Sequence, residues 1–158
     1  MAIIREYKAK LEENGLMILR ESELYRAENK RIRSTSDAAC ILHDVFELGK
    51  EAEENVLCIC MNAQGQIIGA FRSCSGSISA CHFDVGSIAK KCLLLNAVSC
   101  IIAHNHPGGT CTPTDNDIDA TKRVKDALKL IGINLLDHII IPSYSKNYYS
   151  FAEERAMP

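Results

Sequence analysis

Two histidines and an aspartate lie close together in the segment "HNHPGGTCTPTDND", residues 104–117, and could hold a catalytic metal ion. His104 and His106 end an apolar run, so both imidazoles project to the same side of a sheet if the strand continues to them. Asp117 stands at the predicted start of the next helix, near that end of the sheet. Two histidines and one carboxylate leave a fourth zinc position open for water, which is the pattern of a catalytic site.

The same residues also fit an ordinary helix start without a metal. The sequence "TDND" matches a capping box, with Thr114 as the N-cap and Asp117 at the third helical position. The helix dipole favours a carboxylate there, and the histidines could be exposed residues at a strand end. Each residue taken singly favours this structural interpretation, whereas their coincidence in one segment favours a metal site.

Apolar segments bounded by turn signals predict the strands that position these residues. We expect strands over 55–61, 67–73, 98–103 and 134–141. The first of these segments, "NVLCICM", is apolar on both faces, as expected of a central strand that is covered on both sides. The turn "NAQGQ" joins it to the second segment and predicts a hairpin.

Amphipathic patterns predict three helices between these strands. The first covers residues 34–49 and is expected to end at Gly49, and the second begins after Asp84. The third covers residues 115–131, and its inward residues are expected to be Ile118, Val124, Leu128 and Ile131. Together these elements predict an α/β fold: three layers, with a mixed β-sheet and flanking helices.

The first thirty residues read differently. Ile3, Ile4, Tyr7 and Leu11 repeat at helical spacing, and the glycine of "ENG" is a helix stop. A short strand over 16–19 and a charged, exposed connection follow. We therefore expect residues 1–30 to form a peripheral N-terminal helix and connector, and residues 31–158 to form the main domain.

Composition excludes several classes of protein. The chain has 158 residues, 47% hydrophobic and 24% charged, which is typical of one soluble globular domain. With a net charge of −2, the chain lacks the excess of positive charge that is typical of proteins that bind nucleic acid. No apolar run is long enough to cross a bilayer, and the charged N-terminus is no signal peptide, so we expect a cytoplasmic protein without a membrane partner. Most of the eight cysteines lie in apolar segments, which predicts reduced core thiols, with Cys111 in a loop.

The segment "HNHPGGTCTPTDND" resembles the H-x-H-x7-S-x-x-D signature of the JAMM metallopeptidases, the JAB/MPN superfamily. It is most similar to the RadC-like bacterial branch, which typically carries HNHPSG and then T-P-S-x-x-D. The segments "LLDHIII" and "SYSKNYYSFAEE" are similar to two further motifs of that branch, so the resemblance runs from Ile32 to Ala152. It implies the JAB/MPN, cytidine-deaminase-like architecture for residues 31–158.

The resemblance also implies a function, that of a zinc-dependent hydrolase of the JAMM type acting on a peptide or isopeptide bond. It makes His104, His106 and Asp117 the Zn²⁺ ligands, with no other cofactor. The family has a glutamate immediately before the first long strand, and Glu54 stands there, so it becomes the general base and then the general acid. The hydroxyl of Thr114 would hydrogen-bond the developing oxyanion.

Two departures from the family pattern stand out. Thr114 replaces the family serine, which keeps the hydroxyl and adds a methyl group. Val85, Gly86 and Ser87 replace a Pro-Arg-Glu triplet, so any substrate or subunit contact that these Arg and Glu residues make in relatives is in doubt here.

Two other classes of function stay open. One is an accessory protein of DNA repair or of mobile elements, for which the basic cluster "RAENKRIR" at 26–33 is the sequence support, although an exposed connector also explains it. The other is a metal-free MPN fold that serves as a binding module. The presence of polar residues at all the motif positions argues against this second alternative. We expect a peptide or protein substrate as the partner. The chain's charge disfavours nucleic acid, and a dimer formed through an edge strand is left open.

Overall fold

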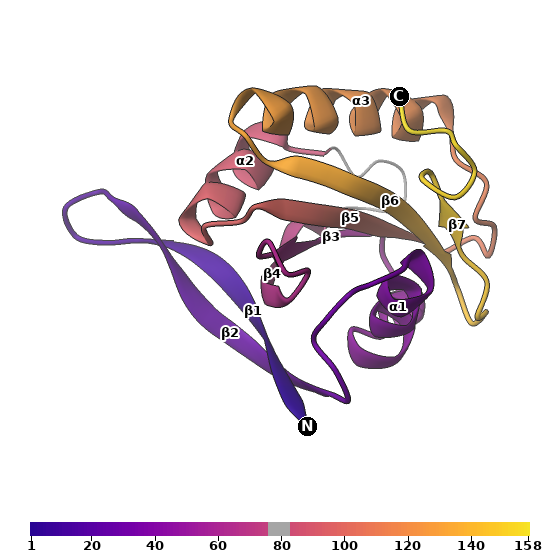
Figure 1. The fold of residues 1–158 in the computed structure, drawn as a ribbon, viewed down its shortest axis with the longest axis horizontal. Coiled ribbons are helices and arrows are strands. Elements are labelled where there is room, and N and C mark those ends of the chain that lie inside the picture. The colour runs from indigo at the N-terminus through magenta and orange to yellow at the C-terminus, as the bar shows by residue number, and fades with distance from the viewer. Residues whose placement is uncertain (76–82) are drawn as a thin grey trace.

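A seven-stranded mixed sheet forms the central layer of the protein in the computed structural model, which describes residues 1–75 and 83–158 (Figure 1). The strand order is β2-β1-β4-β3-β5-β6-β7. β1 pairs with β4 and β5 with β6 in parallel, and the other neighbours are antiparallel. The strand bounds are β1 Ala2–Leu11, β2 Met17–Ala27, β3 Asn55–Met61, β4 Ile67–Ser75, β5 Ser99–His106, β6 Asn134–Pro142 and β7 Tyr149–Ser150.

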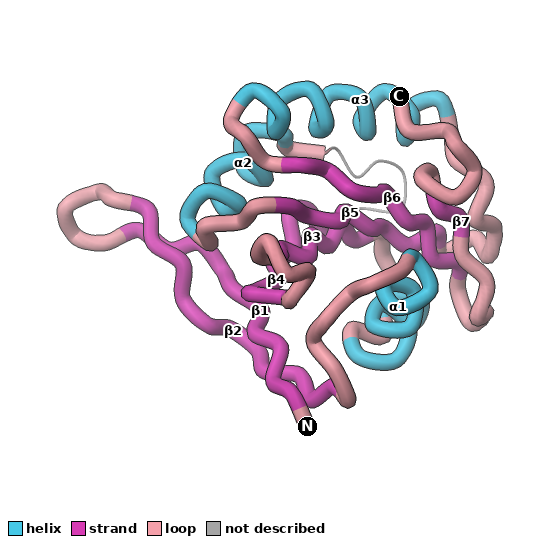
Figure 2. The backbone as a smooth tube through the Cα atoms, viewed as in Figure 1, coloured by secondary structure: helices cyan, strands magenta, loops and turns pink. Residues whose placement is uncertain are grey.

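Helices cover both faces of this sheet, which confirms the predicted three-layer α/β domain. On one face lie α1 (Thr35–Cys40), a π-helical turn (Ile41–Val45) and a 3₁₀ turn (Leu48–Lys50). On the other face lie α2 (Val85–Leu94) and α3 (Asp115–Leu130), as Figure 2 shows. Each face has its own apolar core, and every residue of β3 is buried, as predicted for a central strand.

Side-chain caps begin the three α-helices as the sequence predicts. Ser34, Asp84 and Thr114 are the N-caps, and each accepts a hydrogen bond from a backbone N–H in the first turn. The predicted end of the first helix at Gly49 is wrong, because the π-helical turn ends at Val45 with Phe46 as its C-cap, and Glu47 takes a left-handed φ of 50°. Gly49 has a different use, since a Cβ there would lie 2.9 Å from the carbonyl oxygen of Pro142.

The buried face of α3 agrees in part with the predicted one. Val124 and Leu128 are buried as predicted, whereas Ile118 and Ile131 are 42% and 40% exposed. Asp117, Ala120 and Thr121 complete the inward face. A pattern of apolar residues could not find the whole of this face, because Asp117 and Thr121 occupy inward positions that a structural helix would give to apolar side chains.

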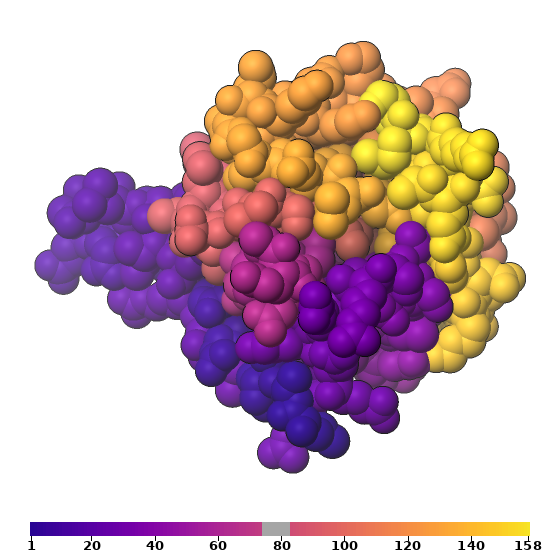
Figure 3. All heavy atoms as spheres, in the orientation of Figure 1, coloured from indigo at the N-terminus to yellow at the C-terminus, as the bar shows by residue number. Residues whose placement is uncertain are grey.

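The N-terminal segment is a β-hairpin, so the predicted helix and connector over residues 1–30 are wrong. β1 and β2 pair along their whole length, and the end of the hairpin that carries the turn projects from the rest of the protein, at the left of Figure 3. β1 also pairs with β4 through Glu6 and Tyr7, and Ile4 is only 1% exposed. The hairpin therefore belongs to the central sheet.

A buried glutamate explains why the sequence pattern misleads here. Ile4 and Glu6 are both buried and face the same core, which is the alternation of a strand. Glu6 is 2% exposed and accepts hydrogen bonds from the Tyr25 hydroxyl at 2.8 Å and from Arg72 Nε at 3.3 Å. A glutamate is almost never fully buried without such partners, so the sequence alone assigns it to the surface and hides the alternation.

The cysteines described by the structure agree with the prediction of core thiols. Cys58, Cys60, Cys92 and Cys100 are fully buried and free, while Cys40 is exposed and Cys111 half-buried. Cys81 and the side chain of Cys74 lie outside the described part of the chain. Within that part, helices of the length and apolar character needed to cross a membrane do not occur.

Candidate metal centre

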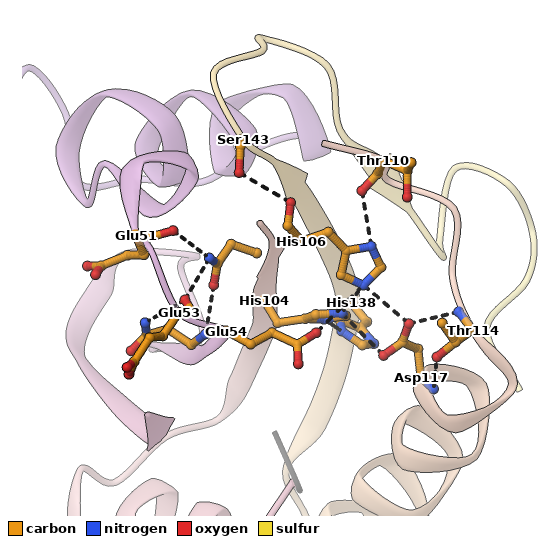
Figure 4. A network of polar contacts seen from close by, with 12 residues as sticks. Glu51, Glu53, Glu54, His104, His106, Thr110, Thr114, Asp117, His138 and Ser143 are labelled. Atoms are coloured by element: carbon orange, nitrogen blue, oxygen red, sulfur yellow. Dashed lines mark hydrogen bonds and ion pairs between the residues drawn. The ribbon is translucent and has the colours of Figure 1, made fainter. Parts of the chain in front are cut away.

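The end of β5 brings the two predicted histidines together. His104 Nε2 lies 2.9 Å from His106 Nε2, so both rings project to the same side of the sheet, as the alternation predicts. The side chain of His104 is 1% exposed and that of His106 is 13% exposed. Solvent therefore reaches the pair on the His106 side, and Figure 4 shows both rings beside Asp117.

The first turn of α3 adds the predicted carboxylate. Asp117 Oδ1 lies 3.2 Å from His104 Nε2, and Asp117 Oδ2 lies 3.5 Å from His106 Nε2. The capping box exists as well, because Thr114 Oγ1 accepts a hydrogen bond from Asp117 N, and Thr114 N donates to Asp117 Oδ2 at 2.8 Å. The two interpretations of this segment are thus compatible, since the cap holds the Asp117 carboxylate beside both histidines.

Glu54 is the acid of the run "KEAEEN" that reaches the histidines. It lies directly before β3, and its Oε1 is 3.9 Å from His106 Nε2 with the side chain 23% exposed. Glu53 is exposed, and Glu51 forms an ion pair with Arg72 at 3.1 Å. The structure therefore places all five predicted site residues, Glu54, His104, His106, Thr114 and Asp117, around one point.

Asn105 fixes the segment that carries Glu54. It lies between the two histidines in β5, points to the opposite face, and is fully buried. Its Oδ1 accepts from Asn55 N at 2.7 Å, and its Nδ2 donates to the carbonyl oxygens of Glu53 at 2.9 Å and Glu51 at 3.3 Å. These bonds tie the backbone on both sides of Glu54 to the strand that carries the histidines.

A chain of three hydrogen bonds determines which nitrogen of His104 carries a proton. The Thr121 hydroxyl donates its single proton to the carbonyl oxygen of Asp117 at 2.6 Å, so it must accept from His138 Nδ1, also at 2.6 Å. Burial lowers the pKa of His138, which keeps its ring neutral. His138 Nε2 is then an acceptor, and His104 Nδ1 must donate to it at 2.7 Å.

The second histidine is oriented in the same way by the loop that follows it. His106 Nδ1 lies 3.0 Å from the carbonyl oxygen of Thr110, an atom that can only accept. Both rings therefore carry a proton on Nδ1, so a neutral ring has its lone pair on Nε2, beside the Asp117 carboxylate. The two Nε2 atoms are 2.9 Å apart, and two lone pairs at this distance repel unless a cation, either a proton on one of the rings or a metal ion, lies between them or beside them.

The charges around the centre favour a cation. The hydrogen bond with Asp117 raises the pKa of His106 against the effect of burial. Burial alone would raise the pKa of Asp117, but its hydrogen bonds with His104 and His106 hold that pKa well below its usual range. A permanently ionised carboxylate beside two ring nitrogens is a set of ligands for a positive ion.

The distances in this set fit an ion of the size of zinc. Ligand atoms about 2.0–2.1 Å from Zn²⁺ in a tetrahedral site lie about 3.3 Å from one another. The three separations measured here are 2.9, 3.2 and 3.5 Å. Glu54, His104 and His106 also have ligand atoms within 4.8 Å of one another, so a second carboxylate lies close to the two histidines.

Three residues that support the centre escaped the sequence analysis, namely Asn105, Thr121 and His138. The motif HNH contains Asn105, but its role requires knowing that its side chain faces the loop before β3. His138 belongs to "LLDHIII", whose apolar pattern reads as a buried strand. A histidine in such a strand is a signal of a buried polar contact, but its partners, Thr121 and His104, come from other elements.

Comparisons with known proteins agree with this geometry. The model of the RadC-like JAB domain matches residues 32–156 of the chain. A UPF0758 protein of Carboxydothermus hydrogenoformans is 36% identical over 110 residues, which is 70% of this chain and 48% of the relative. UPF0758 proteins of Roseiflexus castenholzii and Actinobacillus pleuropneumoniae are each 32% identical, over 86% and 83% of this chain and 56% and 60% of the relatives. The chain thus spans about half to three fifths of the length of these curated relatives.

Proposed function

The chain belongs to the family of RadC-like JAB domains, and from this premise we propose that it is a zinc-dependent hydrolase of peptide or isopeptide bonds. One observation carries the proposal. The two Nε2 lone pairs of His104 and His106 face the ionised Asp117 carboxylate, and a further carboxylate, Glu54, lies 3.9 Å from His106 Nε2. A site with three ligands and a separate base is the arrangement of a catalytic rather than a structural zinc.

His104, His106 and Asp117 would hold the ion. When bound there, Zn²⁺ would polarise a water molecule and lower its pKa from about 15.7 toward about 7. The ring of His104 is held by His138, and the carboxylate of Asp117 is held by the backbone of Thr114, so neither side chain needs to reorganise to bind. Pre-orientation of this kind strengthens metal binding.

Glu54 is the group that moves protons in this proposal. Its carboxylate lies on the more exposed side of the pair of histidines, which is where a water molecule and a substrate approach. Glu54 takes a proton from the water that attacks the carbonyl carbon. It then returns the proton to the nitrogen of the departing amine, so the C–N bond breaks without forming an amide anion.

Thr114 supplies a hydrogen-bond donor at the edge of the site. Its Oγ1 accepts from Asp117 N through a lone pair, so its hydroxyl proton stays free to donate to the oxygen of a tetrahedral intermediate. A single donor of this kind contributes about 3 kcal/mol to transition-state stabilisation.

Variants of Thr114 separate its two roles. Thr114→Ser is expected to keep or mildly raise turnover, because it keeps both the cap and the hydroxyl. Thr114→Ala should lower kcat by roughly 100-fold through loss of the oxyanion donor and cost about 1 kcal/mol of stability through loss of the cap, with the zinc content unchanged. The measurements are steady-state kinetics, thermal unfolding and elemental analysis. Equal turnover in the alanine variant would leave Thr114 as a helix cap only.

Thr121 tests the orientation of His104 without changing the side chain of a proposed ligand. In Thr121→Val the side chain keeps its shape but loses the acceptor for His138 Nδ1, so His138 can move its proton to Nε2. His104 Nδ1 must then accept that hydrogen bond, so the proton of the neutral His104 ring moves to Nε2. Protonated Nε2 has no lone pair with which to bind zinc. Zinc affinity, measured by competition with a chelator, should fall by roughly 10- to 100-fold, and Thr121→Ser should restore it. Unchanged affinity in the valine variant would remove the hydrogen-bond chain from the binding site.

A cleavage experiment tests the proposed reaction directly. The chain, loaded with zinc, is incubated with a panel of defined peptides that includes peptides joined through a lysine side chain, and products are identified by mass spectrometry. Cleavage that needs zinc and is absent from a chelated sample supports the proposal. If zinc binds and no peptide in either class is cleaved, while an authentic metallopeptidase cleaves the same panel, the binding-module alternative is favoured.

The alternative of a role in DNA repair has one structural feature in its favour. Arg26, Lys30, Arg31 and Arg33 are all exposed between the end of β2 and the start of α1. The chain nevertheless carries a net charge of −2, and this short cluster alone gives a weak electrostatic attraction to phosphates. An electrophoretic shift assay on duplex DNA, run beside the peptide panel, distinguishes the two functions.

A further inference from the structure

Four fully buried thiols meet on the face of the sheet that α2 and α3 cover. Cys58 and Cys60 alternate in β3 and therefore face the same side, and Cys60 lies directly opposite Cys100 of β5. Cys92 approaches from α2. All four side chains belong to the same core and have an exposure of 0%. Three separate elements thus place sulfur atoms at one point.

The sulfur atoms have the spacing of metal ligands. Cys92 Sγ is the central atom, 3.9 Å from Cys58 Sγ and 3.7 Å from Cys60 Sγ. All three sulfurs lie within 4.8 Å of one another. Thiolates bound about 2.3 Å from zinc lie about 3.8 Å apart in a tetrahedral site and about 4.0 Å apart in a trigonal one.

We propose that Cys58, Cys60 and Cys92 bind a divalent thiophilic cation of the zinc class. This structural site lies in the apolar core, apart from the histidine centre. Thiolates are soft ligands, which select such ions over Mg²⁺ or Ca²⁺. Each of the three thiols would release its proton to solvent on binding, and a closed site of this kind stabilises the fold that forms it.

Positive charges near the thiols reduce the free-energy cost of a buried site with three thiolates. Three thiolates in an apolar core would be costly without compensation. The Lys91 ammonium donates to the carbonyl oxygen of Arg72 at 3.1 Å and lies 5.2 Å from the ring centroid of Phe71, which is the cross-strand partner of Cys58. A divalent ion would offset two of the three negative charges, and this ammonium, one residue removed from Cys58, reduces the cost of the third.

Cys100, which lies opposite Cys60, remains a thiol in this assignment. Ordinary packing of cysteines as small apolar side chains does not require three sulfur atoms from two elements to converge at this spacing.

Cobalt substitution tests the site. The full chain is refolded from denaturant under anaerobic, reducing conditions with Co²⁺, so that burial of the sulfurs does not prevent entry of the ion. We expect absorption from sulfur-to-cobalt charge transfer that saturates at one ion per chain, a signal that the ligands of the histidine centre do not give. Refolded chain without this absorption would overturn the proposal.

Cysteine variants locate the signal. The Cys40→Ser/Cys74→Ser/Cys81→Ser/Cys111→Ser variant should keep the absorption, since it retains the three proposed ligands and Cys100. Cys92→Ala should lose it, with Cys60→Ala as a second variant. Absorption that persists in both alanine variants would contradict the assignment. If neither variant folds, X-ray absorption of zinc in His104→Ala/His106→Ala decides, because the proposal requires sulfur scatterers at about 2.3 Å and fails without them.

Discussion

Glu54→Gln is expected to lower hydrolysis of a peptide substrate by roughly 100- to 10,000-fold, because glutamine keeps the size and hydrogen-bonding reach of the side chain and loses its basicity. Zinc content and fold should stay nearly unchanged, since Glu54 lies 3.9 Å from His106 Nε2 and the three proposed ligands do not include it. The loss should appear in kcat, with KM little changed, because the proton transfer occurs in the transition state. Steady-state kinetics, elemental analysis and circular dichroism are the measurements.

Glu53→Gln is the matched control for this result. Glu53 is adjacent in the chain and exposed, and its backbone carbonyl rather than its side chain is held by Asn105. Its substitution should change stability by no more than about 0.5 kcal/mol and leave turnover unaltered. If Glu53→Gln lost activity and Glu54→Gln kept it, the base would be assigned to the wrong neighbour. Full activity in both variants would end the proposed proton transfer for this chain.

The sequence predicts how the side chains of the candidate centre are grouped better than it predicts the rest of the fold, and the reason lies in local geometry. His104 and His106 share a strand, and Thr114 and Asp117 share one helical turn, so their relative positions follow from the periods of a strand and a helix. Glu54 is different, because nothing local to "KEAEEN" separates it from Glu51 and Glu53. Only the resemblance to a family selected it, and its approach to His106 depends on the contact of Asn105 with a distant loop.

The parts that the sequence could not predict are those in which polar side chains take core positions. Glu6 is buried because Tyr25 and Arg72, which lie 19 and 66 residues away in the chain, satisfy its carboxylate. Thr121 and His138 occupy inward positions of α3 and β6 because they satisfy each other. A prediction from apolar residues assigns such polar residues to the surface. It therefore predicted a helix where the N-terminal hairpin lies and predicted that Ile118 is buried.

The asymmetry between the two proposed metal sites follows from the same geometry. The histidine centre opens to solvent on the His106 side, so an ion there exchanges and a substrate can approach. The thiol cluster is closed on all sides, so an ion there is acquired during folding and released only when the chain opens. Mild dialysis against a chelator should therefore empty the histidine centre first.

His104→Ala/His106→Ala is expected to lose one zinc equivalent relative to the wild-type chain. The double variant keeps Asp117 but removes both Nε2 ligands, and one carboxylate does not hold the ion against dilution. The single variants should each lower zinc affinity by more than the roughly 10- to 100-fold expected for Thr121→Val, which disturbs a ligand without removing it. The zinc content per chain of the wild type and of the variant, purified side by side, is measured by elemental analysis. Zinc bound elsewhere in the chain contributes equally to both values, so it does not affect their difference.

His43→Ala is the control for this experiment, because His43 contacts the carbonyl oxygen of Asn147 on the face of the sheet that α1 covers and takes no part in the centre. It should keep the full zinc content. A double variant that retained the same zinc content as the wild type would show that His104 and His106 are not ligands, whatever the geometry of their rings. If the double variant lost one equivalent and the hydrolysis of every peptide tested, while Glu54→Gln lost the hydrolysis alone, binding and proton transfer would be assigned to separate residues of one site.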